Sequence, residues 1–330
     1  MPAIEWRPPT REDDDAWLEL LAAIDEVDGR GERYAVEDLD DEWASVWAHP
    51  ATDATFGWDG GELVAFGWLK VQPCAGARHR IALWGGVRPS HRRHGVGSRL
   101  LATQLDRAAA IAATLDPSRP VEVEVDTVDH QPDQACLVTA AGLAPAGHLL
   151  ELARPLGPSA PPVAPIVVPP GLERRRWSEA LDEPTRLAHN AAFAGQRVQE
   201  PHDREHWRQW LTGHRSFRPE LSLAVIDPRA PDEDAVVGYV LSATYPQDWI
   251  DGPREAWITT VGTRPDARGR GIARAGISAV LVAAAEAGYE RAVLGVDADN
   301  PTGAVALYRS LGFVDLRAST TYAKALPVSR

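Results

Sequence analysis

The sequence predicts a mixed α/β fold built from two similar domains, each with a central sheet flanked by helices. The chain has 330 residues, which is enough for two domains that each bury a core. A glycine-rich turn between an expected strand and an expected helix occurs twice, at 92–97 and at 268–273. The proline-rich stretch 156–170 between the copies is typical of a semi-rigid linker. The first domain is therefore expected over 1–155 and the second over 171–330.

In the first domain, the spacing of apolar residues distinguishes helices from strands. Trp17, Leu21 and Ile24 recur at helical intervals, whereas residues 121–125 alternate as a strand does. The turn Asp-Gly-Gly at 59–61 is typical of a hairpin. Strands are therefore expected at 4–7, 55–58, 63–71 and 121–125, and helices at 11–27, 36–47 and from about 97 to 115.

The second domain restarts the same order of elements. The stretch 256–261 is rich in aromatic and β-branched residues, which favours a strand. The apolar, alanine-rich stretch 272–287 favours a buried helix. Asn300 before Pro301 suits the N-cap and first position of a further helix at 302–310. The other expected elements are strands at 172–177 and 291–296 and helices at 179–193 and 203–211.

Residues 268–273, Arg-Gly-Arg-Gly-Ile-Ala, lie where the expected strand turns into the expected helix. The first turn of such a helix carries unpaired N–H groups and about half a positive charge. Because glycine has no side chain, a phosphate can approach this backbone, and arginine adds charge and donors. The turn is therefore predicted to bind a pyrophosphate. Neither a Walker P-loop nor the dinucleotide fingerprint fits, since the latter needs Gly or Ala where Arg274 stands.

This turn resembles the acyl-CoA loop of the GNAT N-acetyltransferase superfamily, Arg/Gln-x-x-Gly-x-Gly/Ala. The segment after the turn is also similar to the family's pattern: an apolar strand, Asn300 and Pro301, a helix that contains Tyr308, and Leu-Gly-Phe at 311–313. The resemblance implies two tandem GNAT-like domains, each with a mixed, mostly antiparallel sheet. It also implies acetyl-CoA as the co-substrate.

The resemblance further implies roles for individual residues. In the family, a tyrosine on the last helix commonly protonates the departing CoA thiolate, and Tyr308 stands at that place. A glutamate on the strand before the loop often acts as general base, a place that Glu255 fits, with Asp251 as an alternative. The implied cofactor contacts are Thr260, Val261, Thr263, Arg268, Gly269, Arg270, Gly271, Ile272, Ala273 and Asn300, with Arg92, Gly95 and Gly97 in the first copy.

The two copies differ where the chemistry would occur. Counting back from the glycine that closes each copy, Val138 stands where the second copy has Tyr308, and His130 where it has Asn300. Valine cannot donate a proton. The second domain is therefore expected to be catalytic and the first to be a degenerate copy, for which binding of CoA is left open.

The composition narrows the class of protein. Charged and apolar fractions of 25% and 44% are those of a globular protein, and no apolar run is suited to crossing a membrane. A net charge of −13 argues against nucleic acid as a partner. The two cysteines, Cys74 and Cys136, lack the spacing of a disulfide framework or a zinc site, so no metal is expected. The cytoplasm is the expected location, as a monomer or homodimer.

The sequence therefore predicts an N-acetyltransferase that passes an acetyl group directly from acetyl-CoA to a primary amine of a small molecule. The tandem arrangement resembles that of mycothiol synthases, in which the C-terminal domain is active, and of less-defined bacterial acetyltransferases. His202, His206 and His214 fall where the family builds its acceptor pocket, either as pocket residues or as exposed ones. The alternative is a non-catalytic acyl-CoA-binding sensor or scaffold, which would need no thiolate acid.

Overall fold

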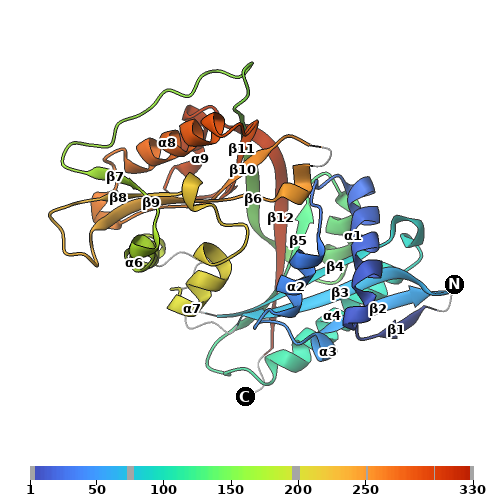
Figure 1. The fold of residues 1–330 in the computed structure, drawn as a ribbon. Coiled ribbons are helices and arrows are strands. Elements are labelled where there is room, and N and C mark those ends of the chain that lie inside the picture. Colours follow the sequence, from blue (N-terminus) through green and yellow to red (C-terminus); the bar gives the residue numbers. More distant parts are fainter. Residues whose placement is uncertain (1–3, 73–77, 195–200, 250–251, 301, 328–330) are drawn as a thin grey trace. The chain divides into compact units, whose positions relative to one another are not determined.

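A computed structural model describes residues 4–327 except 73–77, 195–200, 250–251 and 301 (Figure 1). The chain forms two compact units. The first comprises Met1–Leu149 together with Ala318–Arg330, and the second comprises Leu150–Arg317. Each unit has its own helices and its own part of the β-structure.

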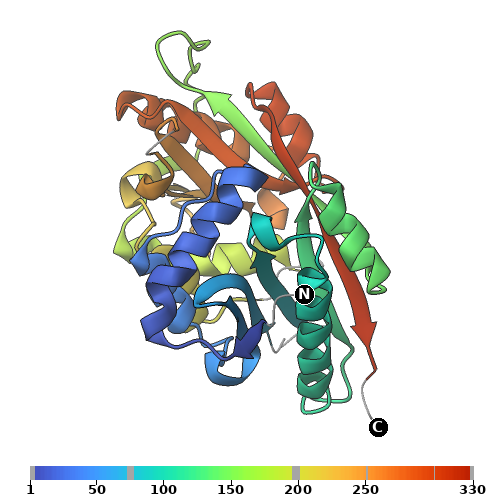
Figure 2. The same ribbon diagram turned by 90° about the vertical axis from the view of Figure 1, so that its right-hand side faces the viewer.

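The first unit contains a mixed sheet in which antiparallel pairs predominate. Among the described strands of this unit, only β4 and β5 run parallel to each other. The last place in this order is taken by the end of β12, the long final strand of the chain (Figure 2). The strand order is β1 (Glu5–Arg7), β2 (Ala54–Asp59), β3 (Glu62–Gln72), β4 (His79–Val87), β5 (Val121–Val128) and β12 (Val314–Leu326).

Helices of the first unit cover both faces of this sheet. On one face, Trp17 of α1 is fully buried and stacks on Trp68 with ring centroids 4.8 Å apart. On the other face, Val138 of α5 packs with the apolar side of α4 against β4 and β5. Burial of these apolar faces is what stabilises the two layers. The helices are α1 (Asp14–Asp28), α2 (Val36–Trp43), α3 (Pro50–Asp53), α4 (Val96–Ala112) and α5 (Pro132–Ala140).

The second unit repeats this strand arrangement. Neighbouring strands from β7 to β10 are antiparallel, and β10 pairs with β11 in parallel. The mixed, mostly antiparallel sheet that was predicted is therefore confirmed. The strand order is β7 (Glu173–Arg176), β8 (Leu223–Ile226), β9 (Val236–Ala243), β10 (Glu255–Thr263), β11 (Arg291–Asp297) and β6 (Ala144–Pro155).

Two pairs of helices lie on opposite faces of the second sheet (Figure 1). Alternation along β9 shows this, because Tyr239 and Leu241 pack with α6 whereas Val240 packs with α8. The glycine-turn helix α8 therefore lies opposite α6, which follows the first strand of this unit. The helices are α6 (Asp182–Phe193), α7 (Arg204–Trp207), α8 (Ile272–Glu286) and α9 (Ala304–Ser310).

The proline-rich stretch 156–170 packs on the second unit. Val163, Ile166 and Val168 contact its apolar core. The Ile166 N–H donates to Ser278 Oγ at 3.1 Å, and that hydroxyl donates to the Ala164 carbonyl at 2.6 Å. The predicted linker therefore runs along α8, and its contacts place it within Leu150–Arg317.

Several predicted helices have different bounds in the structure. The helix expected at 302–310 begins only at Ala304, because Gly303 takes a left-handed conformation with φ +74° and turns the chain first. Asn300 is therefore not its N-cap. The helix expected at 36–47 ends at Trp43. The one expected at 203–211 is α-helical only to Trp207 and continues as a π-helical turn, Arg208–Thr212.

Gly262 permits a close approach between β9 and β10. A Cβ atom at this position would lie 2.3 Å from the ring of Tyr239, which pairs with Gly262 across the two strands. The ring cannot easily move, since Tyr239 is 2% exposed and its hydroxyl bonds to His189 Nδ1 at 2.6 Å. Only glycine fits here without displacing a buried ring.

We expect Gly262→Ala to lower the free energy of unfolding by about 1–3 kcal/mol, the usual cost of overpacking a core. Denaturant titration of the purified variant measures this. Gly147→Ala in β6 is the matched control, because its Cβ would meet nothing closer than 3.8 Å. An equal loss in both variants would contradict the steric explanation.

Candidate active site

The predicted phosphate-binding turn joins β10 to α8 in the second unit. Gly269 and Gly271 both take left-handed conformations, with φ +74° and +80°, and α8 begins directly after Gly271. A Cβ atom at either glycine would have nothing within 4 Å. The backbone of this turn is therefore open in front of the helix N-terminus, as binding of a phosphate requires.

The first unit repeats the backbone of this turn. Gly95 has φ +81°, and α4 begins directly after it. Arg93, the counterpart of Gly269, has φ +64° and is the one non-glycine residue with positive φ in the described chain. A left-handed arginine costs conformational energy that a glycine does not. The turn geometry is thus retained even where the glycine is absent.

The first arginine of each turn braces the turn against the rest of its own unit. Arg268 donates to the Ala192 carbonyl on α6 at 2.6 Å and to the Thr263 carbonyl at 3.4 Å. Arg92 likewise donates to the Val87 carbonyl at 3.0 Å and to the carboxylate of Asp28 on α1. These arginines act as positioning residues for the turn.

Arg270 is the remaining cation of the second turn. Its side chain is exposed and forms no hydrogen bond or ion pair with the residues that the structure describes. It can therefore turn toward an anion held at the start of α8 without breaking a hydrogen bond or an ion pair.

β10 carries a bulge that its counterpart in the first unit lacks. Pairing of β10 with β9 shifts by one residue between Ile258 and Thr260, which leaves Thr259 outside the register. Pairing of β4 with β3 continues without a shift from Ala65 to Gln72. Beyond Trp257, β10 also leaves the register that it shares with β11. Backbone groups of β10 on the side of β11 are thus available to a ligand in the second unit.

Tyr308 lies on α9 and packs into the same apolar core as Ile272, the first residue of α8. Its ring meets Phe313 edge-on, with centroids 6.0 Å apart, and the residue is 8% exposed. Burial raises the pKa of the Tyr308 hydroxyl to about 12. The phenol therefore keeps its proton at neutral pH. Val138 occupies the equivalent place in the first unit and is buried.

The sequence pattern of the acetyltransferase (GNAT) family matches the chain twice, at residues 15–117 and 181–313. The chain belongs to this family. Its relatives include the mycothiol acetyltransferase of Thermobispora bispora, 31% identical over 265 residues, which are 78% of either chain. The mycothiol acetyltransferase of Saccharomonospora viridis is 29% identical over 315 residues, 92% of this chain and 93% of that one. The prediction of an N-acetyltransferase is confirmed, and the family's acyl donor is acetyl-CoA.

Solved structures agree on the fold of the family. A GCN5-related N-acetyltransferase from Sphaerobacter thermophilus superposes with a TM-score of 0.77 at 24% identity, covering 99% of this chain and 97% of that one. A tandem GNAT protein from the clavulanic acid biosynthesis pathway gives 0.72 at 18% identity and covers 99% and 100%. At these identities the likeness concerns the fold, which is a tandem GNAT fold.

Glu255, the predicted base, begins β10 and is 7% exposed. Arg291 at the start of β11 forms an ion pair with it, and the indole of Trp257 donates to its other oxygen at 3.2 Å. These contacts fix Glu255 at the end of β10 away from the turn. Its role as a base stays a prediction, and Asp251 lies outside the described residues.

Three histidines that were considered for the acceptor pocket lie in different surroundings. His202 is half-buried, and burial lowers its pKa, which keeps the ring neutral at neutral pH. His206 pairs with Asp203 at 3.1 Å on the surface. His214 Nδ1 lies 2.7 Å from Ser216 Oγ. The ring centroid of His202 lies 4.9 Å from that of His189 on α6.

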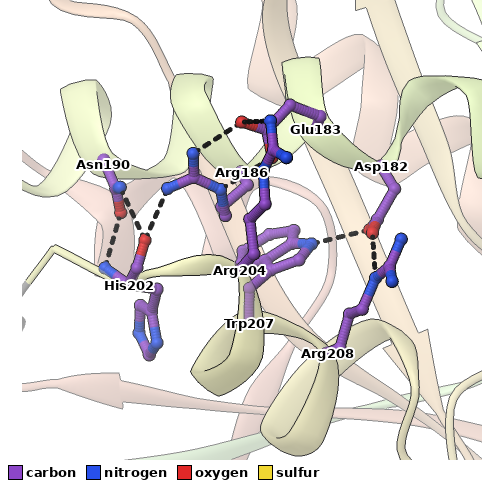
Figure 3. Close-up of polar contacts among 8 residues, drawn as sticks. All are labelled: Asp182, Glu183, Arg186, Asn190, His202, Arg204, Trp207 and Arg208. Carbon is purple, nitrogen blue, oxygen red and sulfur yellow. Dashed lines mark hydrogen bonds and ion pairs between the residues drawn. The ribbon is translucent and has the colours of Figure 1, made fainter.

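Residues of α6 that the sequence did not single out hold the segment around His202 (Figure 3). Arg186 donates to the His202 carbonyl at 2.6 Å, and Asn190 bonds to both the carbonyl and the N–H of His202. Arg186, together with Arg204, also lowers the pKa of Glu183 to about 2. The side chains of α6 thereby fix the position of the segment around His202, which leads into α7.

Asp182 at the start of α6 is buried and holds the π-helical turn. It accepts hydrogen bonds from Trp207 Nε1 and Thr212 Oγ1, each at 2.7 Å (Figure 3 shows the first). The carboxylate borders an open pocket of about 240 Å³. The lining residues are Glu179, Ala180, Asp182, Glu183, Arg204, Trp207 and Arg208.

On the α6 side of the sheet, His189 and Tyr239 form a buried polar pair against Gly262. Burial raises the pKa of Tyr239 well above its usual value, so the hydroxyl remains protonated. The first unit places Phe66 against Gly86 in the same pairing, and a phenyl ring carries no hydroxyl that needs a partner. The polar pair is therefore particular to the second unit.

Within the described residues, no helix is both long and apolar enough to cross a membrane, and no group of three side chains suited to a metal ion occurs.

We expect Asp182→Ala to lower the free energy of unfolding by about 1–3 kcal/mol, because the buried indole N–H of Trp207 loses its acceptor. Thermal or urea unfolding measures the loss. Asp182→Asn keeps one carbonyl oxygen and should lose less. Equal losses in the two variants would show that the charge, and not the acceptor, matters.

Proposed function

We propose that the second unit transfers an acetyl group from acetyl-CoA to a primary amine of a small molecule, with Tyr308 as the general acid. The observation that carries this is the combination found there: an open left-handed turn, a bulged strand beside it and a protonated tyrosine. The first unit has the turn but neither the bulge nor the tyrosine.

The turn suits the pyrophosphate of CoA. The N–H groups of 269–273 stand at the helix N-terminus, with open space in front of Gly269 and Gly271. Arg270 adds a cation, while Arg268 holds the turn in place through Ala192. Asn300 lies in the loop between β11 and α9. Its side chain accepts a hydrogen bond from the Thr302 N–H at 2.9 Å and thereby shapes the backbone of that loop.

The bulged strand suits the thioester. Residues 259–263 depart from the pairing with β11, so the pantetheine arm can bond to Thr260, Val261 and Thr263 as an added strand would. A backbone N–H that points at the thioester oxygen stabilises the negative charge that develops when the amine attacks.

Tyr308 suits the last step of the transfer. The neutral amine forms the new C–N bond, the C–S bond then breaks, and the sulfur leaves as a thiolate that needs a proton. A phenol with a pKa of about 12 is protonated at neutral pH and can donate to that sulfur. Once the C–N bond has formed, the nitrogen carries a positive charge and loses one proton to a base, for which Glu255 remains the candidate.

The acceptor that we propose is a mycothiol-related amine. The support is the name shared by the relatives, which match 78–93% of their own length to this chain. The net charge of −13 also favours an amine over an anionic acceptor.

The function is tested by thiol release from acetyl-CoA in the presence of a panel of amines that includes the amine precursor of mycothiol. We expect turnover with a small primary amine and none without one. Gly271→Glu should abolish turnover, because a carboxylate would occupy the open space in front of the helix. Binding of acetyl-CoA without turnover of any amine would support a sensor instead.

For Tyr308→Phe we expect kcat to fall by about 10²–10⁴-fold, the usual contribution of a general acid. The KM for acetyl-CoA should change little, because the ring still packs in the core. Steady-state kinetics with the best amine measures both constants. Val138→Ala is the control in the first unit and should leave kcat unchanged. An unchanged kcat in Tyr308→Phe would remove Tyr308 from the mechanism.

A further inference from the structure

In each unit, the strand that leads into the glycine turn separates from its parallel neighbour, and a cofactor bound at the turn would lie in the gap between them. In the first unit, β4 and β5 share register only from His79–Val121 to Ala82–Glu124, although both strands continue further. In the second, β10 and β11 share register only from Glu255–Arg291 to Trp257–Val293. Each unit therefore has a gap that opens toward its glycine turn.

Three contacts span the mouth of the gap in the first unit. His130 Nε2 lies 2.7 Å from the Asp28 carbonyl at the end of α1. Arg93 of the turn pairs with Asp133 at 3.0 Å, at the start of α5. A longer contact of 3.5 Å joins the Arg30 guanidinium to the Gln134 side chain. We call these three contacts the latch. They join the segment after β5 to the end of α1, to the loop that follows α1 and to the turn, so a ligand that reached the turn through the gap would have to pass them.

The second unit has no counterpart to the ion pair of the latch. The residues equivalent to Arg93 and Asp133 are Gly269 and Gly303. A Cβ atom at either glycine would have nothing within 4 Å. Asn300, the counterpart of His130, bonds to Thr302 of its own loop. The same two backbone positions thus carry opposite charges in one unit and open space in the other.

Charge at the mouth adds to this obstruction. A pyrophosphate at the first turn would have to break the pair of Arg93 with Asp133 and would then face the carboxylate of Asp133. Like charges at short range oppose binding. The unshifted register of β4 with β3 further means that the first unit lacks the bulge that β10 carries in the second unit.

We propose that the latch closes the cofactor groove of the first unit, so that the chain takes up one acetyl-CoA, in the second unit. This rests on the proposed function of the second unit and extends it to the first. The retained turn in the first unit then serves folding: it starts α4 and receives the brace from Arg92 to Asp28.

Calorimetric titration of the full chain with acetyl-CoA tests the proposal. We expect one site in the wild type, loss of binding in Gly271→Glu, and unchanged stoichiometry and affinity in Gly95→Glu. The variants are matched, since Gly95 and Gly271 have φ +81° and +80° and nothing within 4 Å of a Cβ, so backbone strain is the same. Thermal unfolding of both confirms that they fold.

The other outcomes are distinguishable. Two sites in the wild type, or residual binding in Gly271→Glu that the added Gly95→Glu removes, would overturn the proposal. Loss of binding in Gly95→Glu with full binding in Gly271→Glu would overturn both the proposal and the proposed function. No binding in the wild type would overturn the statement that one cofactor is taken up.

Hydrogen exchange followed by mass spectrometry tests the latch itself. Acetyl-CoA should protect peptides that cover 269–273 and leave those that cover 93–97 unchanged. The double variant Arg93→Gly with Asp133→Asn removes the ion pair and adds no glycine to α5. Because this pair is exposed, its loss should hardly change stability, while exchange at 130–134 should rise at least twofold. Unchanged exchange there would show that the latch does not hold the segment.

Discussion

A left-handed backbone turn at the start of a helix is the constraint on which both units depend. The turn reverses the chain after β4 and after β10 and aims the N-terminus of α4 or α8 at the end of the preceding strand. An arginine one turn earlier ties it to the helix on the opposite face, through Asp28 or the Ala192 carbonyl. Because the brace links the two helical layers of a unit across its sheet, the turn is part of the fold as well as of the binding site.

The buried pair of His189 and Tyr239 shows how the second unit differs beneath the same backbone. An apolar pair such as the one around Phe66 needs no hydrogen bond, whereas a buried hydroxyl and imidazole must satisfy each other. Such a pair specifies one geometry, because a small displacement would break a short bond in a low-dielectric core. Because Tyr239 contacts Gly262, the fixed geometry of the pair lies next to β10, the strand that carries the bulge.

Local features were predictable from the sequence, and features that join distant segments were not. The strand, the turn and α8 follow from residues that are neighbours in the chain, and so does the repeat. The predicted start of α9 was wrong, because Gly303 turns the chain before the helix begins and overrides the cap signal of Asn300. The partner of Glu255, Arg291, is 36 positions away, and no local pattern indicates that β12 ends beside β5. Those pairings are decided by which apolar faces can be buried together.

The two units differ at the mouth of the groove because the groove of the second unit has to admit a ligand and that of the first does not. An open gap between strands exposes backbone N–H and C=O groups, which need either water or a ligand. A unit that keeps its ligand must leave glycine at the mouth, as at Gly269 and Gly303, so that the entering group meets no side chain. In the first unit side chains bridge the mouth instead, and Arg93 with Asp133 does this at the same two positions. Arg93 then keeps the strained, left-handed φ that glycine adopts at the equivalent position of the second unit.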